Sequence, residues 1–422
     1  MTAQPLKRVT AIAFSGVDKK SSDEERPVRL CNYIDVYNHE SITAGLPFME
    51  ATARNEQIRR FSLKRDDVLV TKDSETPDDI AVPAWVAVDM ADVVCGYHLA
   101  RLRPGPAIDG RYLFWALASR LGRSQFSALT NGITRFGLRY EAFGTVQIPV
   151  PSLARQHAIV DCLDRETVRI DALIAHRQRM AELVIERWDA VIRRATRLGL
   201  HADRLVRQSG VPWIGEVPEG WLVLPLRRVG RLMAGTAFPD AKQGRDDGPI
   251  PYFKVADFNH PENGEYLTVA ENTVTLDVAR ALHSPIYPAS AVVFPKIGAA
   301  LLSNRRRLLA KASCTDQNVM GLVVSRGHPR FYYYLLQSFD FGRLRMPGPV
   351  PLLNEADAAS ILVPVPPEDE QAAIVTHLDA RAASVRRALG ALDQQLSRLH
   401  ERRAALITAA ITGELEIPEV AA

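Results

Sequence analysis

The sequence contains an internal repeat, and this feature restricts the possible folds more than any other. Residues 149–200 align without a gap with residues 364–415, so the two segments are offset by 215 positions. A second match lies upstream, where residues 5–9 resemble residues 225–229. The 422 residues are therefore predicted to form two copies of one unit. Because two copies are too few for a solenoid, we expect a molecule with pseudo-twofold symmetry.

Each repeated segment is predicted to form one long helix. Residues 152–198 contain no glycine or proline, and their apolar residues follow the alternating four-three spacing of a coiled coil. At about 1.5 Å per residue such a helix is roughly 65 Å long, and an apolar seam of that length needs a partner. Two amphipathic helices that lie separately on their own domains are the alternative. Matched length and frame favour pairing of the helices with each other, through Leu163, Ile170, Ile174, Val184, Val191, Leu378, Val385, Leu389, Leu392, Leu396, Leu399 and Leu406.

Capping and turn residues mark the ends of both helices. Ser152 is suited to cap the first helix, and the acidic residues 368–370 place negative charge in the first turn of the second, where the helix dipole favours it. Gly199 is expected to end the first helix, and Gly413 and Pro418 the second.

The parts that precede the helices have the mixed pattern of an α/β fold. We predict two repeated α/β domains, separated by two long helices. The predicted division is an α/β domain at 1–150, a helix at 151–200, a linker and α/β domain at 201–365, and a helix at 366–422. Strand-like runs occupy 67–71, 97–102, 291–294 and 319–324, and helical patterns occupy 111–121 and 330–339.

Positive charge is concentrated in one stretch of each copy. The whole chain has 52 Lys and Arg against 49 Asp and Glu, and its net charge of +3 argues by itself against a nucleic-acid binder. Residues 93–140, however, hold seven arginines and one acid, and residues 278–339 hold eight cations and one acid. A solvated surface is the ordinary meaning of one such stretch. Because each of the two units has its own basic stretch, we favour a role in neutralising nucleic-acid phosphates over a solvated surface.

We predict that side chains in and around these stretches contact DNA. Arginine binds guanine O6 and N7 in the major groove, and the amides that lie among the cations suit adenine. The predicted DNA-binding residues are Lys72, Arg101, Arg103, Asn131, Thr134, Arg135, Lys254, Lys296, Asn304, Arg305, Arg306, Arg307, Gln317 and Asn318.

The sequence lacks the motifs of enzymes that act on DNA. It has no phosphate-binding loop of a nucleotide-driven motor, no Asn/Asp-Pro-Pro-aromatic motif of an amino-methyltransferase, and no carboxylate and lysine cluster of a metal nuclease. The four cysteines stand far apart, which argues against a disulfide framework and a zinc site. No run of about 18 uncharged apolar residues suits a membrane span, and Met1–Thr10 is no signal peptide, so a cytoplasmic location is expected.

Several segments resemble the DNA-specificity (S) subunits of type I restriction-modification enzymes. Pro212–Trp221 is similar to the linker that opens a target-recognition domain in that family. Residues 294–299 and 316–322 resemble stretches inside such domains, and residues 364–374 and 402–413 resemble the helical regions. The first copy departs from the pattern, because it has no upstream Trp-Ile-Gly-Glu linker and its helix lacks the alanine-rich ending.

The resemblance implies a division of labour between chains. Each α/β domain would be a target-recognition domain that reads one half of a bipartite, asymmetric target in double-stranded DNA, and an antiparallel pair of helices would fix the spacing of the halves. The helices would dock two modification subunits, which use S-adenosylmethionine to methylate adenine. Two restriction subunits, which are motor-nucleases using ATP and magnesium, would join for cleavage. This chain itself would bind no cofactor and would catalyse no reaction.

Two other classes of function are weighed against this one. A coiled-coil scaffold that binds protein alone would show no salt-dependent affinity for DNA. A single-chain nuclease or methyltransferase would turn over with DNA, magnesium and S-adenosylmethionine in the absence of partners. The repeat, the matched helices and the duplicated basic stretches favour the specificity subunit.

Overall fold

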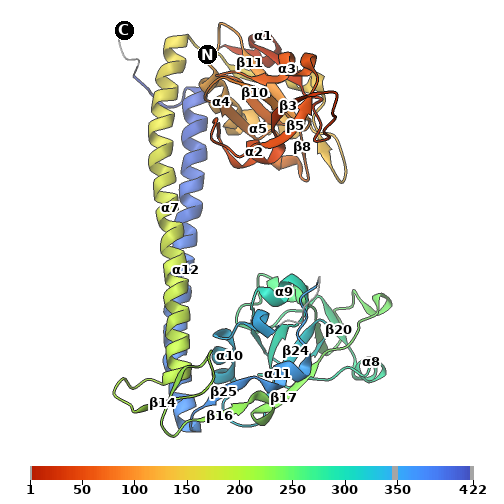
Figure 1. Cartoon of the computed structure of the whole chain (residues 1–422), viewed down its shortest axis with the longest axis vertical. Helices are drawn as coiled ribbons and strands as arrows, with labels where there is room; N and C mark the ends of the chain where they lie inside the picture. The colour runs from red at the N-terminus through yellow and green to blue at the C-terminus, as the bar shows by residue number, and fades with distance from the viewer. Residues whose placement is uncertain (1, 345–349, 419–422) are drawn as a thin grey trace. The chain divides into compact units, whose positions relative to one another are not determined.

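The computed structural model describes residues 2–344 and 350–418 (Figure 1). The chain divides into two compact units. The first unit comprises Met1–Gln178 and Asp393–Ala422, and the second comprises Arg179–Leu392. The predicted parts 201–365 and 366–422 both include a few residues that lie outside the described ranges.

Two long helices contribute to both units, as the sequence predicts. Helix α7 spans Leu153–Leu198 and helix α12 spans Glu368–Thr412. Ser152 caps α7, because its hydroxyl accepts a hydrogen bond at 3.3 Å from the backbone amide three residues later. Gly199 and Gly413 follow the two helices with φ values of 75° and 83°, the left-handed conformation that commonly ends a helix.

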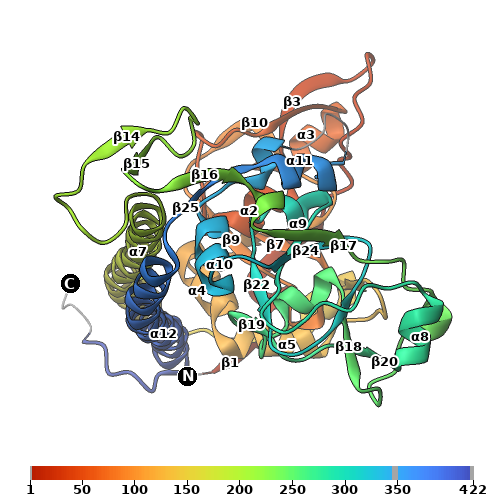
Figure 2. The same ribbon diagram turned by 90° about the horizontal axis from the view of Figure 1, so that it is seen from below.

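The two helices pack against each other in opposite directions within each unit. In the first unit Leu163, near the start of α7, shares a hydrophobic core with Ile411, near the end of α12. In the second unit Ile192, near the end of α7, shares a core with Leu378, near the start of α12. Figure 2 shows the helices side by side, and each of the twelve predicted seam residues is buried or half-buried. The predicted antiparallel coiled coil is confirmed.

The two α/β domains have the same main sheet, which shows the repeat at the level of the fold. Its strand order is β2-β11-β7-β9-β4 in the first domain and β17-β24-β21-β22-β19 in the second. In both sheets every neighbouring pair is antiparallel except the last, which is parallel. The strands are β2 (Thr10–Phe14), β11 (Leu99–Pro104), β7 (Val68–Thr71), β9 (Pro83–Val86), β4 (Ser41–Ile42), β17 (Gly230–Ala234), β24 (Val319–Val324), β21 (Val292–Pro295), β22 (Arg307–Leu309) and β19 (Tyr266–Leu267).

A smaller sheet is repeated as well. Its order is β5-β3-β10-β6 in the first domain and β20-β18-β23 in the second. The pairs β3–β5 and β18–β20 are antiparallel, whereas β3–β10 and β18–β23 are parallel. The strands are β5 (Met49–Ala53), β3 (Arg26–Cys31), β10 (Met90–Cys95), β6 (Ser62–Leu63), β20 (Asn272–Val274), β18 (Ile250–Phe253) and β23 (Cys314–Thr315).

Most of the predicted elements inside the domains are present. The four predicted strands correspond to β7, β11, β21 and β24, and the second predicted helix corresponds to α10 (Pro329–Gln337). The first predicted helix, 111–121, is interrupted: α4 (Gly110–Ala118) ends at Ser119, whose side chain caps α5 (Arg120–Ala128). A serine that caps the next helix thus stops the first one.

One glutamine in each copy ties the domain to the long helix that follows it. Near the start of α7, Gln156 accepts a hydrogen bond at 2.8 Å from the backbone amide of Asp109. Near the start of α12, Gln371 accepts one at 2.8 Å from the backbone amide of His328. Each glutamine also donates at 2.9 Å to the carbonyl five residues earlier. Both side chains are fully buried, so these contacts fix the angle between domain and helix.

We expect Gln156→Ala and Gln371→Ala each to lower the free energy of unfolding by about 1–3 kcal/mol, because each leaves buried backbone groups without a partner. Urea denaturation of the full chain measures the change. Gln395→Ala, at an exposed position of α12, is the matched control and should have no measurable effect. Losses equal to that of the control would show that these contacts do not hold the domains.

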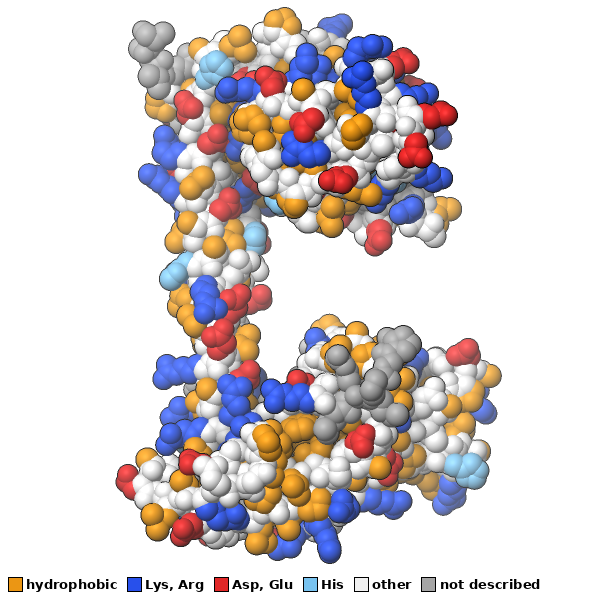
Figure 3. All heavy atoms as spheres, in the orientation of Figure 1, with side chains coloured by type: hydrophobic (Ala, Val, Ile, Leu, Met, Phe, Trp, Pro, Cys, Tyr) orange, Lys and Arg blue, Asp and Glu red, His pale blue; other side chains and the backbone are white. Residues whose placement is uncertain are grey.

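The long helices also expose apolar side chains. Val168, Leu173, Leu183 and Ile185 of α7 are all exposed, and Val168 retains 68% of its accessible surface. Figure 3 shows apolar side chains on the outer surface of the helices between charged ones. Several exposed apolar residues on one long helix are a feature of surfaces that bind another protein.

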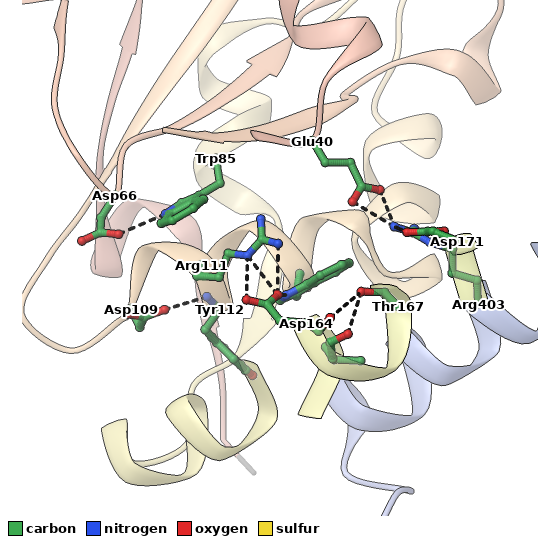
Figure 4. Close-up of polar contacts among 12 residues, drawn as sticks. Glu40, Asp66, Trp85, Asp109, Arg111, Tyr112, Asp164, Thr167, Asp171 and Arg403 are labelled. Atoms are coloured by element: carbon green, nitrogen blue, oxygen red, sulfur yellow. Dashed lines mark hydrogen bonds and ion pairs between the residues drawn. The ribbon is translucent and has the colours of Figure 1, made fainter. Parts of the chain in front are cut away.

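A second contact joins domain and helix about two turns further along each helix. In the first unit, Asp164 of α7 accepts hydrogen bonds from Arg111 at 3.0 Å and from the Trp115 indole at 2.8 Å (Figure 4). Both donors lie on α4. Asp379 is the equivalent residue of α12, and there the donors lie on α10. We call the two arrangements the first and second carboxylate clamps.

The first unit has one more such link. Arg403 of α12 donates to Asp171 of α7 at 2.8 Å and to Glu40 of the α/β domain at 2.7 Å (Figure 4). One guanidinium therefore connects both helices to the domain.

Candidate nucleic-acid interface

One edge of each α/β domain consists of loops that follow equivalent strands. In the first domain the loops follow β2, β3 and β7, and a short connection joins β10 to β11. In the second domain the loops follow β17, β18 and β21, and a short connection joins β23 to β24. We call these the first loop edge, at residues 15–19, 32–37, 72–75 and 96–98, and the second loop edge, at residues 235–238, 254–259, 296–298 and 316–318. Each edge includes one short helix, α2 (Tyr33–Asn38) in the first and the 3₁₀ helix η4 (Val255–Asn259) in the second.

Backbone hydrogen bonds show that the two loop edges share one framework. The Lys72 amide donates to the His98 carbonyl at 3.1 Å, and the Lys296 amide donates to the Asn318 carbonyl at 2.8 Å. In each copy one further backbone hydrogen bond, of 2.9 Å, ties the short connection to the end of the neighbouring strand, β3 or β18. This register equates Asn32 with Lys254, Lys72 with Lys296, Tyr97 with Gln317, and His98 with Asn318.

Four of the predicted DNA-binding residues gather at the first loop edge. Lys72 belongs to it, and its ammonium lies 4.4 Å from the centre of the Tyr97 ring. Asn131, Thr134 and Arg135 are exposed in the loop before β12 (Phe136–Gly137), which pairs with β8 (Asp73–Ser74) directly after Lys72. Residues far apart in the sequence are thus brought to one place.

The first loop edge is hollowed by two adjoining cavities of about 540 and about 430 Å³. Lys19, Tyr33 and His98 line both of them. The larger cavity is mainly apolar, whereas the other is lined by three carboxylates together with Arg135. The His98 ring is held at 2.8 Å from the Asp73 carboxylate. An aromatic recess next to carboxylates and cations suits the edges of bases better than phosphate alone.

Four predicted residues gather at the second loop edge. They are Lys254, Lys296, Gln317 and Asn318, and none of them is buried. Lys254 donates to Gln243 at 2.8 Å, and the Asn318 amide donates to Asp316 at 3.1 Å. Burial raises the pKa of the Asp316 carboxyl, against the hydrogen bonds from Asn318. The Gln317 side chain is exposed.

Two predicted DNA-binding arginines are wrong, because they are buried. Arg101 retains 7% of its accessible surface and donates to the carbonyl of Arg60 at 2.6 Å. Arg306 retains 2% and lies over the Phe341 ring, 4.0 Å from its centre. Burial lowers the pKa of Arg101, and it lowers that of Arg306 to about 9. A guanidinium enclosed in this way cannot reach a phosphate.

Three further predicted residues are engaged in internal contacts. Arg103 forms an ion pair at 2.7 Å with the buried Asp67 carboxylate. Arg307 is half-buried and donates to the Phe258 carbonyl at 3.3 Å. Asn304 has a φ of 53° and accepts a hydrogen bond from Arg306 at 2.5 Å. Arg305 is therefore the exposed member of the arginine run.

The sequence reasoning missed the aromatic part of the first loop edge. Tyr33, Tyr97 and His98 were not among the predicted residues, although Tyr97 and Tyr33 line the larger cavity. The available signal was the pair Tyr97-His98 directly after Gly96, at a turn where an exposed aromatic residue is unusual.

Neither a metal site nor a membrane span is found in the described part of the chain. Within residues 2–344 and 350–418, no three His, Cys, Asp or Glu side chains are grouped as metal ligands would be. No helix in these ranges combines the length and apolar character that crossing a bilayer requires.

The comparison with known proteins matches this picture. Residues 31–180 match the family model of the type I restriction modification DNA specificity domain. Residues 31–180 therefore resemble a type I DNA specificity domain. A curated relative, the specificity subunit of the type I restriction enzyme StySPI from Salmonella potsdam, is 21% identical over 97% of this chain and 88% of its own length. The resemblance predicted from the sequence is confirmed.

A solved structure shows the same fold. It is described as the structural basis of complex assembly and conformational transition of the type I R-M system, is 15% identical, covers 98% of both chains and has a TM-score of 0.70. The HsdS subunit from Thermoanaerobacter tengcongensis is 16% identical over 98% of this chain and 97% of its own, with a TM-score of 0.47. The prediction that this chain catalyses no reaction agrees with its similarity to specificity subunits.

Proposed function

We propose that this chain is the specificity subunit of a type I restriction-modification complex and that it binds double-stranded DNA through its two loop edges. Each α/β domain, at residues 1–150 and 201–365, would be a target-recognition domain for one half of a bipartite, asymmetric target. The observation that carries the proposal is the shared backbone framework, which presents a lysine at the same position of both loop edges. A duplicated scaffold with equivalent cations fits a ligand whose phosphates repeat.

The helices at residues 151–200 and 366–422 would then set the distance between the half-sites, in the way that dimer geometry sets half-site spacing in other DNA-binding proteins. The complex would contain two modification subunits, which methylate adenine with S-adenosylmethionine, and two restriction subunits, which use ATP and magnesium. The exposed apolar residues of α7 and the groove of about 290 Å³ between Trp188 and Val385 support docking of protein partners on the helices. We propose that the complex acts in the cytoplasm and that this chain holds none of the cofactors.

Cells that carry this chain with its modification subunit are expected to methylate adenine at one split sequence motif. Methylome sequencing by a single-molecule method measures this directly, and cells with the modification subunit alone are the control. Absent methylation, or methylation at an unsplit motif, would contradict the proposal. A complex whose DNA affinity does not fall with rising salt would instead favour the protein-binding scaffold.

A further inference from the structure

The shared framework of the two loop edges allows one copy to be compared with the other, residue by residue. Any two DNA half-sites offer the same phosphates but different bases. If both edges bind DNA in the same way, positions that hold the same residue are expected to contact the phosphates, which both half-sites share. Exposed positions that hold different residues are expected to contact the bases, which differ between the half-sites.

Lys72 and Lys296 are the identical pair. The backbone of each is fixed on both sides: its amide donates to the neighbouring connection, and its carbonyl accepts a hydrogen bond at 2.9 Å, from Leu138 in the first domain and from Leu353 in the second. The lysine side chains are partly exposed in both copies. A fixed backbone with a flexible ammonium suits a phosphate, which needs charge but no particular orientation.

Tyr97 and Gln317 are the pair that differs. Both side chains are exposed, and within the described residues neither the Tyr97 hydroxyl nor the Gln317 amide has a hydrogen-bond partner. The residue after each is held by a carboxylate, at 2.8 Å for His98 and at 3.1 Å for Asn318. Each connection therefore presents one exposed side chain, whose polar group has no hydrogen-bond partner among the described residues, on a rigid support. This is the preorganisation that specific binding requires.

We propose that Tyr97 and Gln317 are specificity-determining residues, each of which contacts base edges in its own half of the target, while Lys72 and Lys296 bind an adjoining phosphate in both halves. This inference rests on the proposed function. The two side chains differ in what they can recognise. A glutamine amide pairs with adenine N6 and N7, whereas a tyrosine ring offers apolar contact to the thymine methyl group and one hydroxyl. The two halves of the target would therefore differ at the contacted positions.

The test is selection from a pool of random duplex DNA by the full chain in complex with its modification subunit. The wild-type complex should enrich one split motif. Gln317→Ala should relax one or two positions in one half, with a loss of preference of about tenfold to a hundredfold there. Tyr97→Ala should relax positions in the other half. Lys72→Ala and Lys296→Ala should keep the motif, weaken binding, and each reduce the slope of log affinity against log salt by about 0.9.

The control variant is Gln395→Ala on α12, which should enrich the wild-type motif. Thermal melting of every variant separates altered recognition from altered folding. If the wild type enriches no split motif, the proposed function fails. If the wild type does so and the folded Tyr97→Ala and Gln317→Ala variants enrich the same motif unchanged, the inference is overturned while the proposed function stands. Relaxation of the same half by both variants would also overturn it.

Discussion

Arg306→Ala is expected to destabilise the second unit strongly, whereas Arg305→Ala leaves its stability unchanged. Truncation of a large buried side chain typically costs about 2–5 kcal/mol. Here it also removes the donor for the Phe339 carbonyl, which Arg306 reaches at 3.1 Å, and for the Asn304 side chain. The adjacent Arg305 is exposed, and such substitutions usually change stability by no more than about 0.5 kcal/mol. Urea denaturation of the full chain compares the two variants.

Arg306→Met separates the contributions of volume and of hydrogen bonding. Methionine fills much of the same space without a charge, and replacing a buried charged group by an apolar one of similar volume is often nearly neutral. We expect Arg306→Met to lose less than half as much stability as Arg306→Ala. An equal loss would mean that the hydrogen bonds to Asn304 and Phe339, and not the packing against Phe294 and Phe341, make Arg306 necessary.

The effects of these variants on DNA affinity should differ from their effects on stability. Arg305→Ala is expected to weaken binding through the loss of one phosphate contact, with a salt slope reduced by about 0.9. The Arg306→Met variant, once folded, should bind DNA as the wild type does. Fluorescence anisotropy at several salt concentrations measures both, and normal binding by Arg305→Ala would remove this arginine from the interface.

The long helices were predictable because their signals are local. The apolar spacing, the Ser152 cap and the glycines at 199 and 413 lie within or next to the helices themselves, so a few neighbouring residues decide each boundary. The buried arginines were not predictable in the same way. What encloses Arg306 is the Phe341 ring, which lies 35 positions later in the chain. The sequence of three consecutive arginines does not indicate which of them a distant aromatic ring will bury.

The equivalence of Tyr97 and Gln317 also needed the structure. The long helices align at an offset of 215, but Leu99 of β11 corresponds to Val319 of β24, an offset of 220, and Lys72 corresponds to Lys296, an offset of 224. Insertions and deletions in the loops change the offset from strand to strand. A constant offset therefore equates the wrong residues at the loop edges, whereas the hydrogen-bond register does not depend on loop length.

The second large effect concerns the two carboxylate clamps, which look alike but have different numbers of acids. Arg111 of the first clamp pairs with Asp164, the one carboxylate that contacts it among the described residues. Arg330 of the second clamp pairs with Asp379 at 2.7 Å and also with Glu265 at 2.5 Å. Burial raises the pKa of Glu265, against the attraction of Arg330 and Arg386.

Asp164→Ala is therefore expected to destabilise more than Asp379→Ala, although the residues are equivalent in the repeat. Removing the partner of a fully buried ion costs about 3–5 kcal/mol, and because Asp164 is partly exposed we expect about 2–3 kcal/mol. Asp379→Ala should cost less than half of that, because Glu265 still neutralises Arg330. Hydrogen exchange read by mass spectrometry assigns each loss to α4 or to α10. The double variant Glu265→Ala, Asp379→Ala should restore the larger effect, and equal losses for the two single variants would show that the clamps act through packing and not through charge.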